Sequence, residues 1–159
     1  MSNRWHDIWT EKYDYFLENS NIYRGKSKII DESVDYYFGI FEYSIFLLNN
    51  YNGVCYLGKS EENIAMYLKK LFFSNRINKY DVIKQIILNY YKDLDWNLII
   101  IKMIYPDYYF RFVDMLIRDL KFNDDEVYKI VLMRDSYKDY LIFIIREINN
   151  YKKIDINIY

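Results

Sequence analysis

The stretch DYYFGIFEYSI, residues 35–45, lies at the centre of the segment that decides the fold. Its apolar side chains recur every three or four residues, and this spacing extends over residues 31–49, which is typical of one buried helix face. Asp31 is a good N-cap because its carboxylate accepts free backbone N–H groups of the first turn. Gly39 costs the helix about 1 kcal/mol relative to Ala, so we predict a close helix crossing there. The buried stripe is expected to comprise Val34, Phe38, Phe41, Ile45 and Leu48.

The same spacing continues along the chain and predicts an all-α fold, a single compact domain of about seven helices. One Pro and four Gly are too few breakers for many short strands. The domain is expected to span residues 1–150, and residues 151–159 to form a tail that frays or adds elsewhere as a lone strand. Four helix starts are marked by suitable residues, Ser60, Asn78, Pro106 and Asn123. Helices are predicted over residues 3–19, 31–49, 60–73 and 107–120. Three further helices are predicted to start at residue 78, at residue 93 or 95, and at residue 123. The last of these is expected to break at residues 134–136, and a further helical piece is expected over residues 137–150.

Composition and charge exclude several classes of protein. Apolar residues make up 52% of the 159 and charged residues 28%, which is typical of a globular chain. The net charge is −1 with scattered Lys and Arg, so a nucleic-acid partner is not expected. No apolar run is long enough to span a bilayer and no apolar leader opens the sequence, which predicts a cytoplasmic protein without membrane contact. The single Cys55 excludes an internal disulfide.

One stretch matches a nucleotide-binding pattern. Residues 53–60 read GxxxxGKS, with Gly53, Gly58, Lys59 and Ser60 at the defining positions. That motif uses loop amides and a lysine against phosphates and needs a strand before it and a helix after it. Residues 46–52 read as the end of a helix instead, which favours a chance match. Nucleotide binding stays an alternative, and no cofactor is expected.

No catalytic constellation is evident. His6 lies beside Asp7 on a predicted helix, but a nucleophilic triad also needs a Ser or Cys that converges on it in space. Cys55 precedes Lys59 and a helix start, which can activate a thiol, yet an incidental Cys is the simpler interpretation. The acidic pairs lie at predicted helix starts, where capping explains them. We therefore predict a protein that is not an enzyme and holds no metal.

Aromatic residues offer one candidate surface for a partner. Tyr108, Tyr109 and Phe110 are consecutive, and Tyr36 and Tyr37 are adjacent in the longest aromatic run. A helix turns about 100° per residue, so about half of the run over residues 108–110 must face the interior in any case. These five residues form the predicted partner surface, for another protein or for a second copy of the chain.

Five segments together resemble one family. Trp5 to Leu17 resembles a Trp-x-x-x-Trp helix, and residues 36–45 resemble a Tyr-Tyr-x-Gly-Leu-x-Glu-Asn-Ala-Ile pattern. Residues 60–69 are similar to an Arg-Asp-(Ile/Leu)-Ala-Glu helix, residues 105–110 to a Phe-Pro-x-(His/Tyr)-Tyr-Phe turn, and residues 137–141 to a Tyr-Glu-x-Phe-Leu ending. Their order and spacing resemble the C-terminal lobe of the CotS/YutH group of spore coat proteins, in the aminoglycoside- and choline-kinase-like superfamily.

The resemblance implies a helical, kinase-like lobe and a coat-associated role, but not phosphoryl transfer. The His-containing segment that the family places between its second and third helices is missing here. Glu62 and Asn63 stand where the family has Arg-Asp, and no N-terminal lobe holds a nucleotide. Phosphoryl transfer needs a base, metal ligands and a phosphate cradle together.

Three functional hypotheses follow. The first is a non-catalytic structural or interaction protein, a degenerate kinase-like remnant associated with a spore coat. The second is a small phage or mobile-element inhibitor that binds a host defence or nucleic-acid enzyme through tyrosine-rich contacts. The third is a nucleotide-binding protein that uses residues 53–60.

Overall fold

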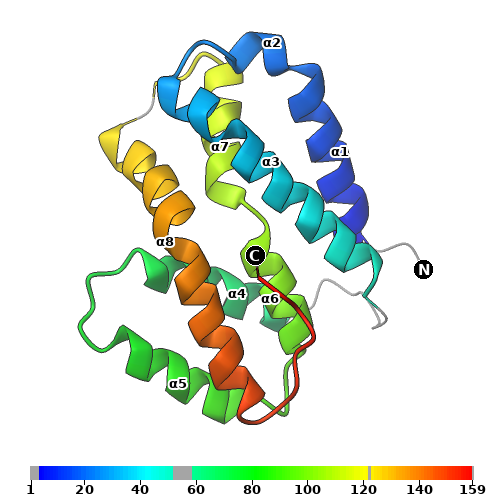
Figure 1. Ribbon diagram of the computed structural model, residues 1–159, viewed down its shortest axis with the longest axis vertical. Coiled ribbons are helices and arrows are strands. Elements are labelled where there is room, and N and C mark those ends of the chain that lie inside the picture. The colour runs from blue at the N-terminus through cyan, green and yellow to red at the C-terminus, as the bar shows by residue number, and fades with distance from the viewer. Residues whose placement is uncertain (1–3, 52–58, 122, 159) are drawn as a thin grey trace. The chain divides into compact units, whose positions relative to one another are not determined.

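The computed structural model describes residues 4–51, 59–121 and 123–158, and every regular element in these residues is a helix (Figure 1). The prediction of an all-α fold is confirmed, because seven of the helices are long and only α2 is a single turn. None of the helices in this part of the chain combines the length and apolar composition that crossing a membrane requires. The helices are α1 (Arg4–Glu18), α2 (Ser20–Tyr23), α3 (Lys28–Asn49), α4 (Lys59–Phe72), α5 (Lys79–Tyr90), α6 (Trp96–Ile104), α7 (Asp107–Ile117) and α8 (Asp124–Asn149).

The chain divides into two compact units. Unit 1 comprises Met1–Tyr56 and Ile104–Asp135, and unit 2 comprises Leu57–Met103 and Ser136–Tyr159. Unit 1 therefore holds α1 to α3, α7 and the first half of α8. Unit 2 holds α4, α5, nearly all of α6 and the second half of α8.

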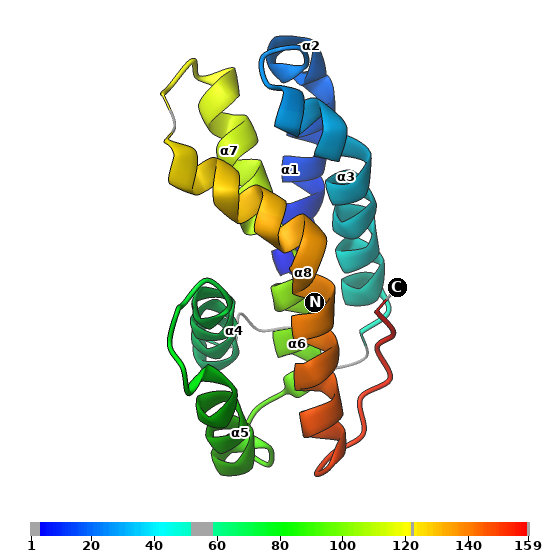
Figure 2. The ribbon, with the colours of Figure 1, turned by 60° about the vertical axis from the view of Figure 1, so that its left-hand side comes forward.

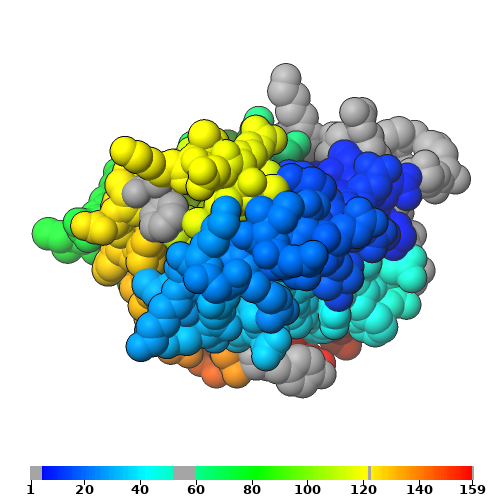
Figure 3. Space-filling view, turned by 90° about the horizontal axis from the view of Figure 1, so that it is seen from above, coloured from blue at the N-terminus to red at the C-terminus, as the bar shows by residue number. Residues whose placement is uncertain are grey.

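Unit 1 is built around aromatic rings. α1 and α3 run side by side in opposite directions (Figures 1 and 2). Trp9 of α1 stacks on Tyr105 with 4.3 Å between ring centroids, and Phe110 of α7 lies 4.4 Å from Phe41 of α3. Seen from above, α2 and the start of α3 lie beside α7 (Figure 3), where Lys26 Nζ donates to the Leu116 carbonyl at 3.1 Å. The rings thus join helices that are far apart in sequence.

The start of α3 differs from the prediction. The helix begins at Lys28, and Ser27 is its N-cap, whose side chain accepts from the Ile30 N–H. Both carboxylate oxygens of Asp31 instead lie 3.1 Å from the Gly25 N–H. Gly25 has φ +84°, a left-handed conformation that glycine adopts without strain. Asp31 therefore fixes the turn before the helix and does not cap the helix itself.

The close helix crossing predicted at Gly39 is wrong. A Cβ atom at this position would meet no atom within 4 Å, and the residue is exposed. Most of the predicted stripe is buried, but Ile45 is only half-buried. The buried face also includes Tyr37, whose hydroxyl donates to the Ile130 carbonyl. That hydrogen bond satisfies the hydroxyl, so a tyrosine lies on the buried face at a position that the predicted stripe did not include.

Unit 2 is built mainly around aliphatic side chains, and its polar groups bond to helix backbones. The Trp96 Nε1–H donates to the Tyr90 carbonyl at 3.1 Å. The Tyr137 and Tyr140 hydroxyls donate to carbonyls of α6 and α4. The second half of α8 thus lies against both helices (Figure 2).

The predicted break at residues 134–136 is wrong, because α8 continues without interruption through them. The segment contains no Gly or Pro, so nothing in it forces the helix to end. Its polar residues make side-chain bonds instead: Arg134 Nη1 donates to Ser33 Oγ at 3.0 Å and Nε pairs with Asp135 at 3.2 Å. The boundary between the two units nevertheless falls directly after Asp135.

Other boundaries shift by small amounts. Lys59 already belongs to α4, so Ser60 lies inside the helix and does not cap it. α7 ends at Ile117, before Asp119, which has φ +55°. The C-terminal segment neither frays nor forms a strand over its described residues. Ile154 and Ile156 are buried, and the Ile154 N–H donates to Asn149 Oδ1 at 2.8 Å.

Candidate functional site

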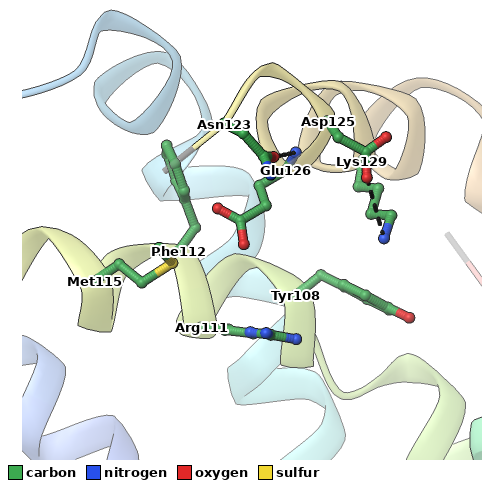
Figure 4. A pocket seen from close by; sticks show the side chains of 8 residues that line it. All are labelled: Tyr108, Arg111, Phe112, Met115, Asn123, Asp125, Glu126 and Lys129. Atoms are coloured by element: carbon green, nitrogen blue, oxygen red, sulfur yellow. Dashed lines mark hydrogen bonds and ion pairs between the residues drawn. The ribbon is translucent and has the colours of Figure 1, made fainter. Parts of the chain in front are cut away.

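A pocket of about 130 Å³ lies in unit 1 between α7 and the start of α8 (Figure 4). Four lining residues come from α7 and four from the α8 N-cap and the first turns of α8. They are Tyr108, Arg111, Phe112 and Met115, and Asn123, Asp125, Glu126 and Lys129.

The spacing of these residues explains why they meet. The α7 residues follow at steps of three, one and three, which places them on one helix face. α8 begins after Asn123, whose side-chain oxygen accepts from the Glu126 N–H at 3.0 Å, so the predicted cap at this position is confirmed. Capping fixes the first turn and so directs Glu126 and Lys129 towards α7 (Figure 4).

Glu126 carries the unusual feature of the pocket. Its carboxylate points from α8 towards α7, into the space beside Phe112 (Figure 4). Its Oε2 atom is buried and accepts no hydrogen bond from the described residues. Asn123 and Glu126 have the spacing of a capping box, in which the acidic side chain turns back to the N-cap N–H. In this structure the Glu126 side chain faces the pocket instead. Its carboxylate therefore points into the cavity and not back to the Asn123 backbone N–H.

The other charged groups of the pocket have neighbours of their own. Lys129 Nζ lies 3.6 Å from Asp125 Oδ2 and 5.6 Å from the centroid of the Tyr108 ring. Burial raises the pKa of the Tyr108 hydroxyl, Asp107 adds to the rise, and the Arg111 guanidinium opposes it. Lys129 and Arg111 therefore lie near Tyr108, whereas Glu126 lies at the end of the pocket that Phe112 lines.

The chain segment that holds the pocket is acidic on balance. Residues 107–129 contain six acidic and four basic side chains. Arg118 pairs with Asp114 at 3.1 Å, as Lys129 does with Asp125. The exposed side chains of Asp119 and Asp124 add negative charge nearby. The helix dipole at the start of α8 favours carboxylates there and helps to hold the Glu126 carboxylate in place.

The predicted aromatic surface divides in the structure. Tyr37, Tyr109 and Phe110 are at most 3% exposed, and Tyr37 stacks on Tyr109 with centroids 4.2 Å apart. These three residues pack the interior of unit 1, so the prediction that they form a partner surface is wrong. Tyr108 lines the pocket. Tyr36 is 39% exposed but is not part of the lining, so its role as a contact stays a prediction.

The nucleotide-binding pattern lies mostly outside the described residues, because Gly53, Gly58 and Cys55 all fall within 52–58. Lys59 and Ser60 form the start of α4, and Ser60 is exposed. His6 Nδ1 lies 3.8 Å from Asp7 Oδ1 on α1. No group of three or more His, Cys, Asp or Glu among the residues with a described position is placed to hold a metal ion.

The sequence pointed to only part of this site. It singled out Tyr108 and the Asn123 cap but not Arg111, Met115 or Glu126. The Asn-x-x-Glu spacing signals a helix start, and it does not reveal that the Glu side chain turns away from its local partner. Comparisons of the chain with models of protein families, with curated proteins and with solved structures gave no match.

Proposed function

We propose that this chain is a non-catalytic structural or interaction protein that binds another protein through the pocket of α7 and α8. The observation that carries the proposal is the buried Glu126 Oε2 atom, which faces the cavity (Figure 4) and has no hydrogen-bond donor among the residues that the structure describes. A buried polar atom without a partner costs about 1–3 kcal/mol. A donor from a binding partner removes that cost and adds a charge-assisted hydrogen bond.

The size of the pocket favours a protein partner over a free metabolite. At about 130 Å³ it is smaller than the roughly 300–1,000 Å³ typical of small-molecule sites. It matches one inserted side chain, the usual anchor of a protein interface. Tyr108, Phe112 and Met115 supply aromatic and thioether contacts of the kind enriched at such interfaces.

The biological setting of the proposal comes from the sequence resemblance. A kinase-like C-terminal lobe without the catalytic segment is a helical scaffold that has kept its capacity to bind. We place it in the cytoplasm as a coat-associated protein, and the partner is then another assembly component.

Site-specific photo-cross-linking in the source cells tests the proposal. A benzoylphenylalanine at position 115 places the reactive group in the pocket, and the same residue at position 128, where Tyr128 is 60% exposed, is the control. We expect a discrete cross-linked protein from position 115 that disappears in Glu126→Gln and is absent from position 128. No cross-link from position 115, or an equal one from both positions, would refute a docking role for the pocket.

A further inference from the structure

Building on the proposed function, we propose that the pocket receives the ammonium group of a lysine side chain presented by the protein partner. The acceptor is the carboxylate of Glu126, whose Oε2 atom is buried and faces the cavity. An ammonium group has three donors and no acceptor, so it complements the Glu126 Oε2 atom, which accepts no hydrogen bond from the described residues.

The walls fit the rest of a lysine side chain. Phe112 is 2% exposed and Met115 is half-buried, and both come from the α7 face opposite Glu126. Lysine buries its four methylene groups along apolar surface while its ammonium group keeps polar contact. An aromatic wall beside the charge adds a cation–π attraction. A residue with a long apolar stem and a positive tip therefore matches both halves of the cavity.

The charge around the pocket favours an incoming cation. Residues 107–129 contain six acidic and four basic side chains, so this segment is acidic on balance, although the two acidic and two basic residues of the lining itself cancel. Lys129 is paired with Asp125, so its charge is partly neutralised before a ligand arrives. Asp119 and Asp124 are exposed and attract a basic segment of the partner at long range.

Arg111 is the competitor within the chain. It is exposed and lines the same pocket. If the Arg111 guanidinium turned towards Glu126, it would bind the carboxylate in place of the incoming lysine. Removing the Arg111 side chain is therefore expected to strengthen lysine binding. Removing a neighbouring side chain that does not compete for Glu126 would have no such effect.

Peptide titrations followed by ¹H–¹⁵N spectra of the full chain test the proposal. The probes are acetylated, amidated pentapeptides with Lys, Gln or norleucine at the centre of four Gly residues. At about 10 mM peptide even a millimolar complex is mostly formed. We expect the Lys peptide to shift the amides of residues 108–129 and to bind at least about tenfold more tightly than the norleucine peptide.

Matched variants locate the effect. Glu126→Gln keeps the shape and an oxygen acceptor but removes the charge, and we expect it to abolish the preference for Lys. Asp14→Asn removes an exposed carboxylate of α1 that does not line the pocket, and we expect it to leave affinity within about twofold. Arg111→Met is expected to tighten Lys binding about threefold or more. Circular dichroism checks that each variant keeps the helix content of the parent.

The possible outcomes distinguish the proposed lysine preference from the proposed docking of a protein partner. Equal binding of the Lys, Gln and norleucine peptides at the pocket overturns the lysine preference and leaves the docking function standing. Binding of butylamine as tight as that of the Lys peptide shows a free-amine site and also overturns the inference. If no peptide shifts the pocket amides and position 115 gives no cross-link, both proposals fail. If the chain forms a dimer that is lost in Glu126→Gln, the partner is a second copy of the chain, and the proposal of a different protein as partner is overturned.

Discussion

The two units fill their interiors with different side chains. Unit 1 uses mostly aromatic residues, whereas unit 2 uses mostly Ile and Leu. The buried aromatic residues of unit 1 are Trp5, Trp9, Phe16, Tyr23, Tyr37, Phe38, Phe41, Tyr105, Tyr109, Phe110 and Phe112. The buried Ile and Leu residues of unit 2 are Leu68, Leu71, Ile83, Ile87, Leu98, Ile99, Ile100, Ile101, Leu141, Ile144, Ile145, Ile148, Ile154 and Ile156.

The difference brings more phenol groups into the interior of unit 1 than into that of unit 2, where Tyr137 and Tyr140 are buried. Burial is the main cause that raises the tyrosine pKa values in both units. In unit 1 a raised pKa is found for Tyr13, Tyr23, Tyr36, Tyr37, Tyr105, Tyr108 and Tyr109. In unit 2 it is found for Tyr140. The stability of unit 1 is therefore expected to depend on hydroxyl protonation more strongly than that of unit 2.

The largest expected effect is alkaline unfolding that starts in unit 1. Tyrosines ionise near pH 10 in the unfolded chain, but burial keeps Tyr37, Tyr105 and Tyr109 protonated in the folded one. Their stabilisation is complete below pH 10 and is lost as pH rises further, by about 1.4 kcal/mol per pH unit for each tyrosine. Urea unfolding between pH 8 and about 12 measures it.

Conservative variants assign that loss to a unit. Tyr37→Phe combined with Tyr109→Phe should flatten the alkaline decline of stability clearly, and Tyr140→Phe should flatten it less. Equal flattening by the double variant and by Tyr140→Phe would show that the aromatic character of unit 1 does not set the pH dependence. Tyr13, whose pKa burial and Glu42 raise to about 12, is expected to titrate after the freely exposed tyrosines in absorbance at 295 nm.

Truncating one core residue in each unit is the next largest change. Phe110→Ala removes ring contacts with Phe16, Phe38 and Phe41 and should cost about 3–5 kcal/mol of unfolding free energy. Ile144→Ala in unit 2 should cost about 2–5 kcal/mol. Urea unfolding gives both values. Phe46→Ala, at a position 60% exposed, is the control and should change stability by less than about 0.5 kcal/mol.

Removing single buried hydroxyls compares the tyrosine hydrogen bonds of the two units at neutral pH. Tyr37→Phe leaves the Ile130 carbonyl without its side-chain donor, and Tyr140→Phe does the same to the Leu68 carbonyl. Each should lose about 0.5–1.5 kcal/mol, because both carbonyls lie in helices and the rings still pack. Thermal unfolding at pH 7 measures the loss. A variant more stable than the parent would show that its hydrogen bond contributes nothing.

The smallest effects come from two glycines of unit 1 and have opposite signs. Gly39→Ala should stabilise the protein by up to about 1 kcal/mol, because a Cβ meets open space within α3. Gly25→Ala should destabilise it by about 1 kcal/mol, because φ +84° strains any residue with a Cβ. Chemical unfolding of the pair provides the measurement. Destabilisation by Gly39→Ala would restore the close crossing that the sequence predicted.

The N-cap rule located most helix starts to within a residue or two, but it identified the capping hydrogen bond only in part: Ser60 lies inside α4, and Asn78 makes no side-chain cap bond at the start of α5. Asn123 caps α8 as predicted, and so does Asp95 for α6, where its carboxylate accepts from the Leu98 N–H at 3.2 Å. Sequence reasoning was unreliable where a residue had a choice of partner. Asp31 binds a turn amide, and Arg134 bonds to Ser33 where a helix break was expected. Glu126, the most important residue of the candidate site, belongs to this second group.

The sequence by itself determined that the chain forms helices, roughly where they begin and end, and which stripes are buried. Those properties depend on residues within a few positions of one another, because a helix repeats every 3.6 residues. Only the tertiary structure decided which unit received the aromatic interior and that Glu126 faces a cavity. These outcomes depend on residues that are distant in sequence, such as Tyr37 and Ile130, and no local spacing encodes the partner that a polar side chain finally meets.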